Sequence, residues 1–266
     1  MPSRLPSTRR QVTQSALSVN RSTYWRQALP STDTSSTVES SRRAVYANGA
    51  GSPPAPPHLS VKVQVSLWQR VVKRCIDVFG AATLLVVLSP LMGLIALAVR
   101  LSSRGPVLFR QERVGQHGRT FEMLKFRTMQ PDSRRVDLGP PPGMPERRRT
   151  HKSPDDPRIT AIGRRLRRTC LDELPQLWNV LMGEMSLVGP RPEIPNIVAS
   201  YAPWQHLRHA VRPGLTGWWQ VNRRDGRPMH AATELDLYYV EHQSLSLDLQ
   251  ILSRTVGAII DGSGVF

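Results

Sequence analysis

Residues 78–99 read VFGAATLLVVLSPLMGLIALAV, and this stretch decides what kind of protein the chain encodes. It contains no charged side chain over 22 residues. As an α-helix, such a stretch would extend about 33 Å, which matches the hydrocarbon core of a bilayer. Ser89 and Pro90 lie in its middle, where a proline removes one backbone hydrogen bond and kinks a helix. The stretch therefore predicts a kinked, membrane-associated helix.

The charges on both sides of this stretch bear on its topology. Five basic residues flank it: Lys73, Arg74, Arg100, Arg104 and Arg110. Because cytoplasmic flanks are rich in Lys and Arg, both ends are expected on the same side of the membrane. A re-entrant helix, which breaks at its Ser-Pro pair and returns to its side of entry, meets that expectation. A single membrane span and a buried core helix of a soluble protein are the two alternatives.

Composition narrows the classes of partner and compartment. The chain has 266 residues, enough for one domain with tails, and a formal net charge of +16. That charge suits nucleic acid, an acidic lipid surface or a phosphorylated substrate. Cys75 and Cys170 form no disulfide framework or zinc spacing, which favours a reducing compartment. The first sixty residues lack the apolar run of a signal peptide, so a catalytic part is expected to face the cytoplasm.

Three segments are expected along the chain. Residues 1–60 are rich in Ser, Pro and Arg and poor in clustered apolar side chains, which predicts a disordered basic tail, with an organelle-targeting peptide as the alternative. Residues 68–104 are predicted to form the membrane-associated re-entrant helix. Residues 105–266 are predicted to form a small cytoplasmic catalytic domain. The expected fold class is α/β, mainly helical with a few short strands.

Several elements can be placed within the predicted catalytic domain. Residues 105–109 and 121–126 have the composition of short strands around a turn at 114–118. Residues 131–157 are rich in Pro, Arg and Asp and are predicted to form a long loop. A helix is expected from about Ile159, with apolar residues on one face and arginines on the others. Such a basic amphipathic helix suits a membrane interface, or else carries a solvated face on a core helix.

The segment TCLDELPQLWNVL, residues 169–181, carries the strongest candidate for chemistry. Its apolar residues recur at helical spacing, which predicts an amphipathic helix with Pro175 in the first turn and a stop at Gly183. Asp172 and Glu173 would lie at the helix start, where the helix dipole and nearby arginines keep them ionised. Such a pair can ligate Mg²⁺ or attack phosphorus. The alternative is that both acids only cap a core helix.

Two loops and one strand end supply cations for a phosphate. The loop SLVGPRP, residues 186–192, holds Arg191 between two prolines, which lowers the entropy lost when the side chain grips a phosphate. The segment VRPGLTGWWQVN, residues 211–222, repeats that pattern. The additional candidate contacts in these stretches and in KFRTM, residues 125–129, are Lys125, Arg127, Arg212 and Gln220.

Taken together, these segments resemble the bacterial sugar transferase family, the monotopic polyprenyl-phosphate phosphoglycosyl transferases that initiate exopolysaccharide, capsule, O-antigen or glycoprotein glycan synthesis. The matching pieces follow the family's order over residues 68–266. They are KRCID (73–77), SP (89–90), FRQERVG (109–115), KFRTM (125–129), DPRIT (156–160), LDELPQ (171–176), SLVGPRP (186–192) and RPGLTG (212–217).

The resemblance implies a two-step reaction. Asp172 would attack the sugar-bearing phosphorus of a UDP-sugar, release UMP and hold the phosphosugar until polyprenyl (undecaprenyl) phosphate takes it. Glu173 would complete the dyad, and Mg²⁺, with Asp172 as its ligand, would neutralise the diphosphate. Position-by-position matching of the motifs implies four phosphate contacts: Lys125, Arg127, Arg167 and Arg191.

The resemblance also implies a location and a set of partners. The kinked helix of the family maps onto Ser89 and Pro90, which would place the enzyme in the bacterial inner membrane with its catalytic domain on the cytoplasmic face. Membrane lipids, the lipid carrier and the UDP-sugar are the expected partners; nucleic acid is not, and a homo-oligomer stays open. The rival readings are a basic nucleic-acid-binding protein and a non-catalytic membrane scaffold. The sugar is undetermined, although residues 219–227 are the place where its contacts are expected.

Overall fold

The computed structural model of the chain describes residues 66–130, 156–222, 229 and 232–261. The predicted tail and nearly all of the predicted loop 131–157 lie outside the described residues, as do residues 223–227 of the segment expected to contact the sugar. The elements, with η denoting a 3₁₀ helix, are α3 (Leu67–Ser102), β1 (Leu108–Val114), η1 (Gln116–Gly118), β2 (Thr120–Phe126), α5 (Ala161–Arg168), η3 (Leu171–Glu173), α6 (Gln176–Met182), β3 (Ser186–Val188), α7 (Pro195–Val198), η4 (Pro203–Ala210), β4 (Gly214–Thr216), α8 (Trp218–Asn222), α9 (Thr233–His242) and α10 (Leu245–Ile260).

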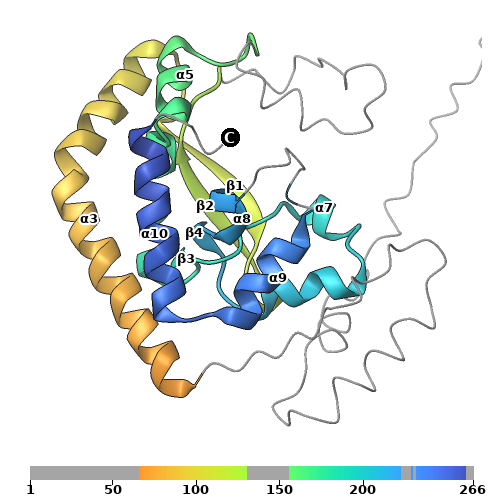
Figure 1. The fold of residues 1–266 in the computed structure, drawn as a ribbon. Coiled ribbons are helices and arrows are strands. Elements are labelled where there is room, and N and C mark those ends of the chain that lie inside the picture. The colour runs from red at the N-terminus through yellow and green to blue at the C-terminus, as the bar shows by residue number, and fades with distance from the viewer. Residues whose placement is uncertain (1–65, 131–155, 223–228, 230–231, 262–266) are drawn as a thin grey trace, which may run out of the picture.

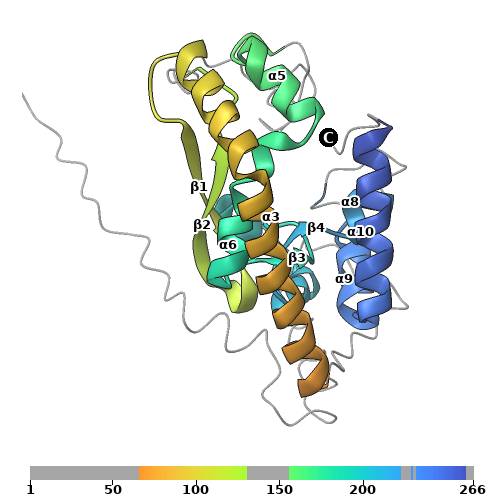
Figure 2. The same cartoon turned by 90° about the vertical axis from the view of Figure 1, so that its left-hand side faces the viewer.

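The long apolar stretch forms α3, a single curved helix of 36 residues that arches along one side of the other elements (Figures 1 and 2). By length and composition it is able to cross a membrane. The helix continues through Pro90, so the expected break at this point is not found. Pro90 has no N–H for the carbonyl of Val86, and the hydroxyl of Ser89 donates to that carbonyl at 2.8 Å instead. This substitute hydrogen bond explains how the helix passes the proline.

The two halves of α3 pack against different elements of the protein. In the first half, the buried carboxylate of Asp77 accepts hydrogen bonds from the hydroxyl of Ser186 and the backbone N–H of Leu187, both at 2.9 Å. In the second half, Val99 is fully buried in a cluster that includes Phe126. The inner side of α3 is therefore attached to the rest of the protein near both of its ends.

Two small sheets lie beneath α3. Strands β1 and β2 pair antiparallel, from Leu108 opposite Phe126 to Val114 opposite Thr120. The prediction placed the first strand at 105–109; it starts later, at Leu108, and runs through Val114, because residues 110–114 also pair with β2. Strands β3 and β4 pair parallel. The predicted fold class, mainly helical with a few short strands, is confirmed.

The parallel pair brings the two glycine-containing motifs, SLVGPRP and RPGLTG, into backbone contact. A Cβ atom added to Gly214 would lie 2.1 Å from the backbone nitrogen of Gly189, and one added to Gly217 would lie 2.2 Å from the Gly189 carbonyl oxygen. No larger residue fits these positions without moving the backbone. The glycines therefore fix how the loop after β3 sits on the loop around β4.

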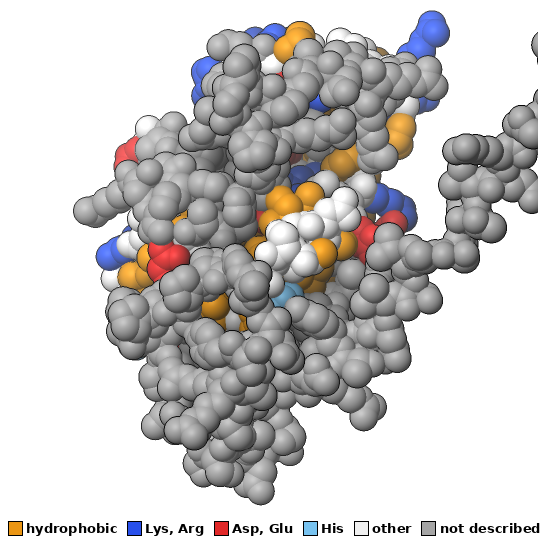
Figure 3. Space-filling model, turned by 90° about the vertical axis from the view of Figure 1, so that its right-hand side faces the viewer, with side chains coloured by type: hydrophobic (Ala, Val, Ile, Leu, Met, Phe, Trp, Pro, Cys, Tyr) orange, Lys and Arg blue, Asp and Glu red, His pale blue; other side chains and the backbone are white. Residues whose placement is uncertain are grey.

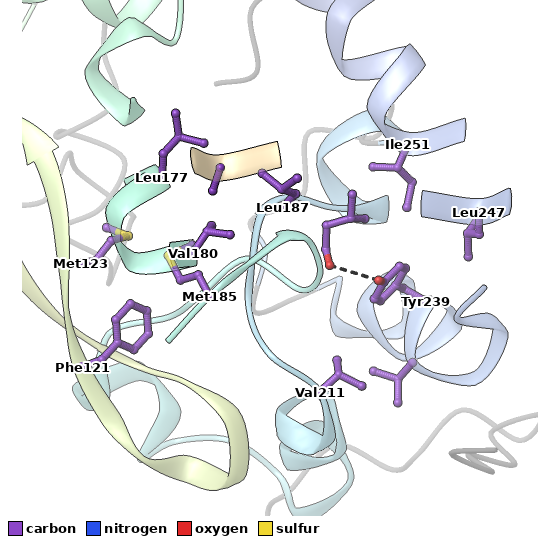
Figure 4. Close-up of a cluster of buried hydrophobic side chains, with 13 residues drawn as sticks. Phe121, Met123, Leu177, Val180, Met185, Leu187, Val211, Tyr239, Leu247 and Ile251 are labelled. Carbon is purple, nitrogen blue, oxygen red and sulfur yellow. Dashed lines mark hydrogen bonds between the residues drawn. The ribbon is translucent and has the colours of Figure 1, made fainter. Parts of the chain in front are cut away.

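The main hydrophobic core joins the two sheets to four helices, α3, α6, α9 and α10 (Figure 4). The hydroxyl of Tyr239, on α9, donates to the carbonyl of Val188 on β3 and lies 2.7 Å from the carboxylate of Asp248 on α10. Asp248 in turn pairs with Lys73 of α3 at 2.7 Å. This buried polar chain ties α3, α9 and α10 to the strand that leads into the Arg191 loop. The labelled core side chains are Phe121, Met123, Leu177, Val180, Met185, Leu187, Val211, Tyr239, Leu247 and Ile251.

Candidate functional site

The turn that presents the two candidate acids lies between α5 and α6. Cys170 adopts a left-handed backbone conformation (φ 56°) that bends the chain after α5. Asp172 and Glu173 follow in η3, and Pro175 is the N-cap residue of α6. The predicted single helix from residue 171 is therefore wrong, since a 3₁₀ turn precedes it, whereas the predicted stop at Gly183 (φ 86°) is confirmed. The predicted helix near Ile159 is α5, which starts two residues later.

Glu173 is a buried carboxylate held by two cations. The side-chain nitrogen of Lys125 lies 2.7 Å from its Oε1, and the guanidinium of Arg191 donates to the same oxygen at 2.5 Å. Burial alone would raise the pKa of Glu173, but the charges and hydrogen bonds of Arg191 and Lys125 outweigh it and lower the pKa below its ordinary value. Glu173 therefore stays ionised and its oxygens are largely occupied.

Asp172 is also buried, but it has fewer hydrogen-bond donors around it than Glu173. The residue is only 5% exposed, and its Oδ1 has no hydrogen-bond partner among the described residues. Burial raises the pKa of Asp172 to about 6; the charge of Lys125 opposes the rise, that of Glu173 adds to it, and those of Arg167 and Arg191 oppose it. An acceptor that is buried without a donor costs free energy unless a ligand completes it. Asp172 is thus the group in this turn that has capacity to bind or attack.

Three of the predicted phosphate contacts gather around this turn. Lys125 is the second-last residue of β2, Arg167 belongs to α5, and Arg191 comes from the loop after β3. Their positive charges all act on the carboxylate of Asp172. Arg167 is also oriented by a hydrogen bond from its Nε to the hydroxyl of Thr128 at 2.9 Å. Three residues from separate elements, which the motif resemblance implies as phosphate contacts, thus lie around one turn; phosphate binding by them stays a prediction.

The other three predicted contacts bind elsewhere in the described structure. Arg127 donates to the carbonyls of Ser103, at 2.8 Å, and Pro106, and so covers the C-terminal end of α3. Arg212 donates from Nε to the carbonyl of Gly183 at 3.0 Å. Gln220 donates to the carbonyl of Leu215 at 3.3 Å. These bonds give the three side chains structural roles, and none of them is among the groups whose charge or hydrogen bond acts on Asp172 or Glu173.

Of the two carboxylates in this turn, one is suited to bind a hard cation such as Mg²⁺ and the other is less suited. Among the described residues, no group of three or more His, Cys, Asp or Glu side chains could enclose a metal ion. The free Oδ1 of Asp172 fits Mg²⁺, which is commonly held by one or two carboxylates together with substrate phosphates and water. Glu173 is less suited, because Lys125 and Arg191 already bind its oxygens.

Sequence reasoning missed one buried group next to the site. Arg208, on η4, is 2% exposed and donates to the main-chain carbonyl of Arg191 at 2.6 Å. Its guanidinium pairs with Asp236 of α9, also at 2.6 Å. No motif or periodicity links these two residues to Arg191. Both elements also contain other polar side chains, such as His206 on η4 and Glu234 on α9, so no local signal marks the pair.

Comparison with known proteins gives one family throughout. The family model described as "Bacterial sugar transferase" matches residues 68–262. An undecaprenyl-phosphate glucose phosphotransferase of Komagataeibacter xylinus is 42% identical over 203 residues, which are 72% of this chain and 36% of that protein. The exopolysaccharide production protein ExoY of Sinorhizobium fredii is 39% identical over 73% of this chain and 88% of its own length.

The name of a third relative includes both of its substrates. The UDP-glucose:undecaprenyl-phosphate glucose-1-phosphate transferase of Escherichia coli is 40% identical over 70% of this chain and 40% of its own length. The chain thus spans well under half of two of these relatives and nearly all of ExoY.

Proposed function

Because the chain belongs to the bacterial sugar transferase family, we propose that it transfers a sugar 1-phosphate from a UDP-sugar to undecaprenyl phosphate and releases UMP. The proposal draws on the activities for which its relatives are named: two of them act on undecaprenyl phosphate, and the Escherichia coli protein also acts on UDP-glucose. The product would be the first lipid-linked sugar of an exopolysaccharide or another surface glycan, in line with the name of the relative ExoY.

The observation that carries the proposal is the unequal state of the two acids in η3. Glu173 is bound by Lys125 and Arg191, whereas the buried Oδ1 of Asp172 has no partner in the described part of the chain. A free carboxylate oxygen surrounded by cations suits attack on an anionic phosphorus. The cations offset the repulsion between the carboxylate and the phosphate oxygens, and an arginine can bind two of those oxygens at once.

The proposed chemistry proceeds in two displacements at the same phosphorus. A carboxylate oxygen of Asp172 forms a bond to the sugar-bearing phosphorus of the donor, and the bond from that phosphorus to the bridging oxygen breaks, so UMP leaves. An oxygen of undecaprenyl phosphate then attacks the phosphorus, and the carboxylate of Asp172 departs unchanged. Lys125, Arg167 and Arg191 bind the phosphate oxygens in both steps. Glu173 keeps Lys125 and Arg191 in place.

A divalent cation would complete the charge balance. Phosphoryl transfer from a diphosphate generally uses Mg²⁺ to neutralise the phosphate oxygens. In this chain Asp172 is the residue that would hold it, because its Oδ1 is the carboxylate oxygen in the turn without a partner among the described residues.

The structure supports a helix that enters the membrane from one side only. Lys73 pairs with Asp248, and Arg74 donates to the carbonyls of Val180 and Leu181, so the first end of α3 is bound to the catalytic part. Near the other end, Arg127 binds the carbonyl of Ser103. Both ends of α3 are bound to the same catalytic part. If α3 crossed the bilayer, its two ends would lie on opposite sides, and the catalytic part could not contact both. We propose the re-entrant, monotopic arrangement on this ground.

The outer side of α3 has the surface that lipid requires. Phe79, Val86, Leu94 and Leu101 recur at helical spacing and are between 67% and 77% exposed. The hydrogen bond from Ser89 also leaves no free carbonyl at Val86, which matters in hydrocarbon. By contrast, another face of the protein mixes hydrophobic side chains with both acidic and basic ones (Figure 3). We therefore propose that α3 lies in the cytoplasmic leaflet of the bacterial inner membrane and the catalytic part in the cytoplasm.

Labelling decides the topology. Single cysteines would be introduced at Leu67 and at Arg104, on either side of the apolar stretch, after Cys75 and Cys170 are replaced by serine. Both positions should react with a membrane-impermeant thiol reagent from the cytoplasmic side of inverted vesicles. Reaction of the two positions from opposite sides would refute the re-entrant arrangement.

Product release and covalent trapping test the activity. Membranes containing the full chain should release UMP from at least one member of a panel of UDP-sugars when undecaprenyl phosphate and Mg²⁺ are supplied. Without the acceptor, a donor labelled in the sugar should leave the label on the protein, in a peptide containing Asp172. UMP release with no labelled protein would refute the covalent step, and no UMP release from any UDP-sugar would refute the proposed donor class.

A further inference from the structure

The loop that carries Arg191 has an unusually complete set of main-chain hydrogen bonds. Four successive carbonyls, from Pro190 to Glu193, each accept one. Backbone N–H groups serve the first and the last: Gly214 donates to Pro190 at 2.9 Å and Val114 donates to Glu193 at 2.8 Å. Prolines at 190 and 192 restrict the backbone further. A loop fixed at every residue holds the side chain of Arg191 against Glu173.

Arginine side chains serve the two middle carbonyls. Arg208 donates to the carbonyl of Arg191 at 2.6 Å, and Arg113 donates to the carbonyl of Pro192 at 3.2 Å. Each of these arginines is paired with a buried acid: Arg208 with Asp236 at 2.6 Å, and Arg113 with Glu193 at 3.4 Å. The pairing removes the cost of an isolated buried charge. Arg208 is therefore held by an acid outside the loop, on α9, whereas Arg113 is held by Glu193 of the loop itself.

Arg208 is the better anchored of the two. Its side chain is 1% exposed, as is that of Asp236, and its second terminal nitrogen donates to the hydroxyl of Tyr201 at 2.7 Å. It thus connects η4, α9 and the Arg191 loop in one buried centre. A buried ion pair of this kind contributes little net stability compared with apolar residues of the same size. Its position directly behind Arg191 suggests a role in geometry instead.

We propose that Arg208, with Asp236 as its counter-charge, is a positioning residue for the transferase reaction that acts through Arg191. By fixing the Arg191 carbonyl, it sets where the Arg191 guanidinium meets Glu173, 2.5 Å away, and therefore where that guanidinium meets a donor phosphate. This inference rests on the proposed function, because the phosphate is that of the UDP-sugar. Arg208 itself faces the main chain and does not touch the substrate.

A double-mutant cycle between Arg208 and Arg191 tests this role. The first variant replaces both buried charges, Arg208→Met with Asp236→Leu, so that neither is left without its partner. The second is Arg191→Lys, and the third combines them. UMP release is measured per folded full-length enzyme. The paired variant should lower kcat roughly 10- to 100-fold, as expected for a displaced binding group. In the Arg191→Lys background, the same pair should change kcat by less than about twofold.

Control variants separate positioning from simple destabilisation. Val240, on α9 one turn after Asp236, is fully buried in the hydrophobic core. Val240→Ala should lower the melting temperature while kcat of the folded enzyme is unchanged. If the paired variant does not fold, Arg208→Lys replaces it in the cycle, because lysine keeps the charge opposite Asp236 but cannot reach the same three acceptors in the same geometry.

The outcomes separate this inference from the proposed function. If the wild-type protein turns over a UDP-sugar and the losses from the two sites multiply, Arg208 does not act through Arg191 and the inference is overturned. An unchanged kcat in the paired variant overturns it as well. No turnover by the folded wild-type protein with any UDP-sugar overturns the proposed function, and the inference with it.

Discussion

Two buried aspartates, Asp77 in α3 and Asp172 in η3, have opposite surroundings. Asp77 is 2% exposed and one of its oxygens accepts two hydrogen bonds from β3, from Ser186 and Leu187. Asp172 is 5% exposed, and its Oδ1 has no partner within the described residues. The same side chain at nearly the same depth therefore serves structure in one place and is available for chemistry in the other. The supply of hydrogen-bond donors, rather than burial, distinguishes the two.

The largest difference is expected when both aspartates receive the same substitution. Asp172→Asn removes the negative charge that attacks phosphorus and should reduce UMP release by about 10³-fold or more. Asp77→Asn keeps an oxygen in position to accept from Ser186 and Leu187, so turnover of the folded enzyme should stay within about threefold. Rates are compared at equal amounts of folded protein. Comparable losses at both positions would show that the contrast between them has no functional meaning.

Removal of magnesium should produce the next largest effect. Chelation with EDTA is expected to lower turnover by about 10²-fold, and added Mg²⁺ should restore it. A second readout does not depend on activity: a ligand that binds the folded state raises the melting temperature. Mg²⁺ with UMP should therefore raise the melting temperature of the wild type and of Asp77→Asn, but not that of Asp172→Asn. Equal shifts in all three proteins would exclude Asp172 as the cation ligand.

The sequence predicts the parts of the site that are expressed in local patterns. The apolar stretch, the Asp172–Glu173 pair and the proline-bracketed Arg191 are each visible within a short window, because periodicity and backbone restriction act locally. In the structure, Lys125, Arg167 and Arg191, which the motif resemblance implies as phosphate contacts, lie around one turn.

The features that the sequence did not predict depend on contacts between distant residues. Arg127 has the same motif context as Lys125, only two positions away, yet it binds the end of α3. Side chains at even spacing on a strand share a face only while the strand continues, and β2 ends at Phe126. Likewise, the 3₁₀ turn at Asp172 follows from the left-handed Cys170, a conformation that no local preference for cysteine indicates.

Stability should respond to the two aspartates with opposite signs. Asp77→Ala leaves two buried donors on β3 without an acceptor and should lower the free energy of unfolding by about 2–4 kcal/mol. Asp172 behaves differently because its pKa in the folded protein, about 6, lies above its ordinary value of 3.8. The folded state therefore binds this proton more tightly, so the contribution of Asp172 to stability is highest below about pH 4, decreases as the pH rises through about 6, and stays lower above it.

Asp172→Asn removes that penalty. Unfolding by urea at pH 7 in EDTA should show the variant to be more stable than the wild type by about 1–3 kcal/mol. At pH 4 the difference should shrink, since Asp172 is then protonated in the folded wild type as well. A destabilised Asp172→Asn protein at pH 7 would mean that the carboxylate is stabilised by contacts, as Asp77 is, and the comparison would fail.

The smallest expected effect concerns how kcat/KM falls at acidic pH. Attack requires the ionised form of Asp172, so at low Mg²⁺ the value of kcat/KM should fall by about tenfold per pH unit below pH 6. Glu173 does not contribute to this limb, because Arg191 and Lys125 hold its pKa below the ordinary value.

Protons and Mg²⁺ compete for the same carboxylate, so raising Mg²⁺ should move the limb to lower pH. Arg167→Gln removes one of the charges that oppose the raised pKa and should move the limb to higher pH. A limb near pH 4 that responds to neither change would show that the free oxygen of Asp172 is not the group that titrates.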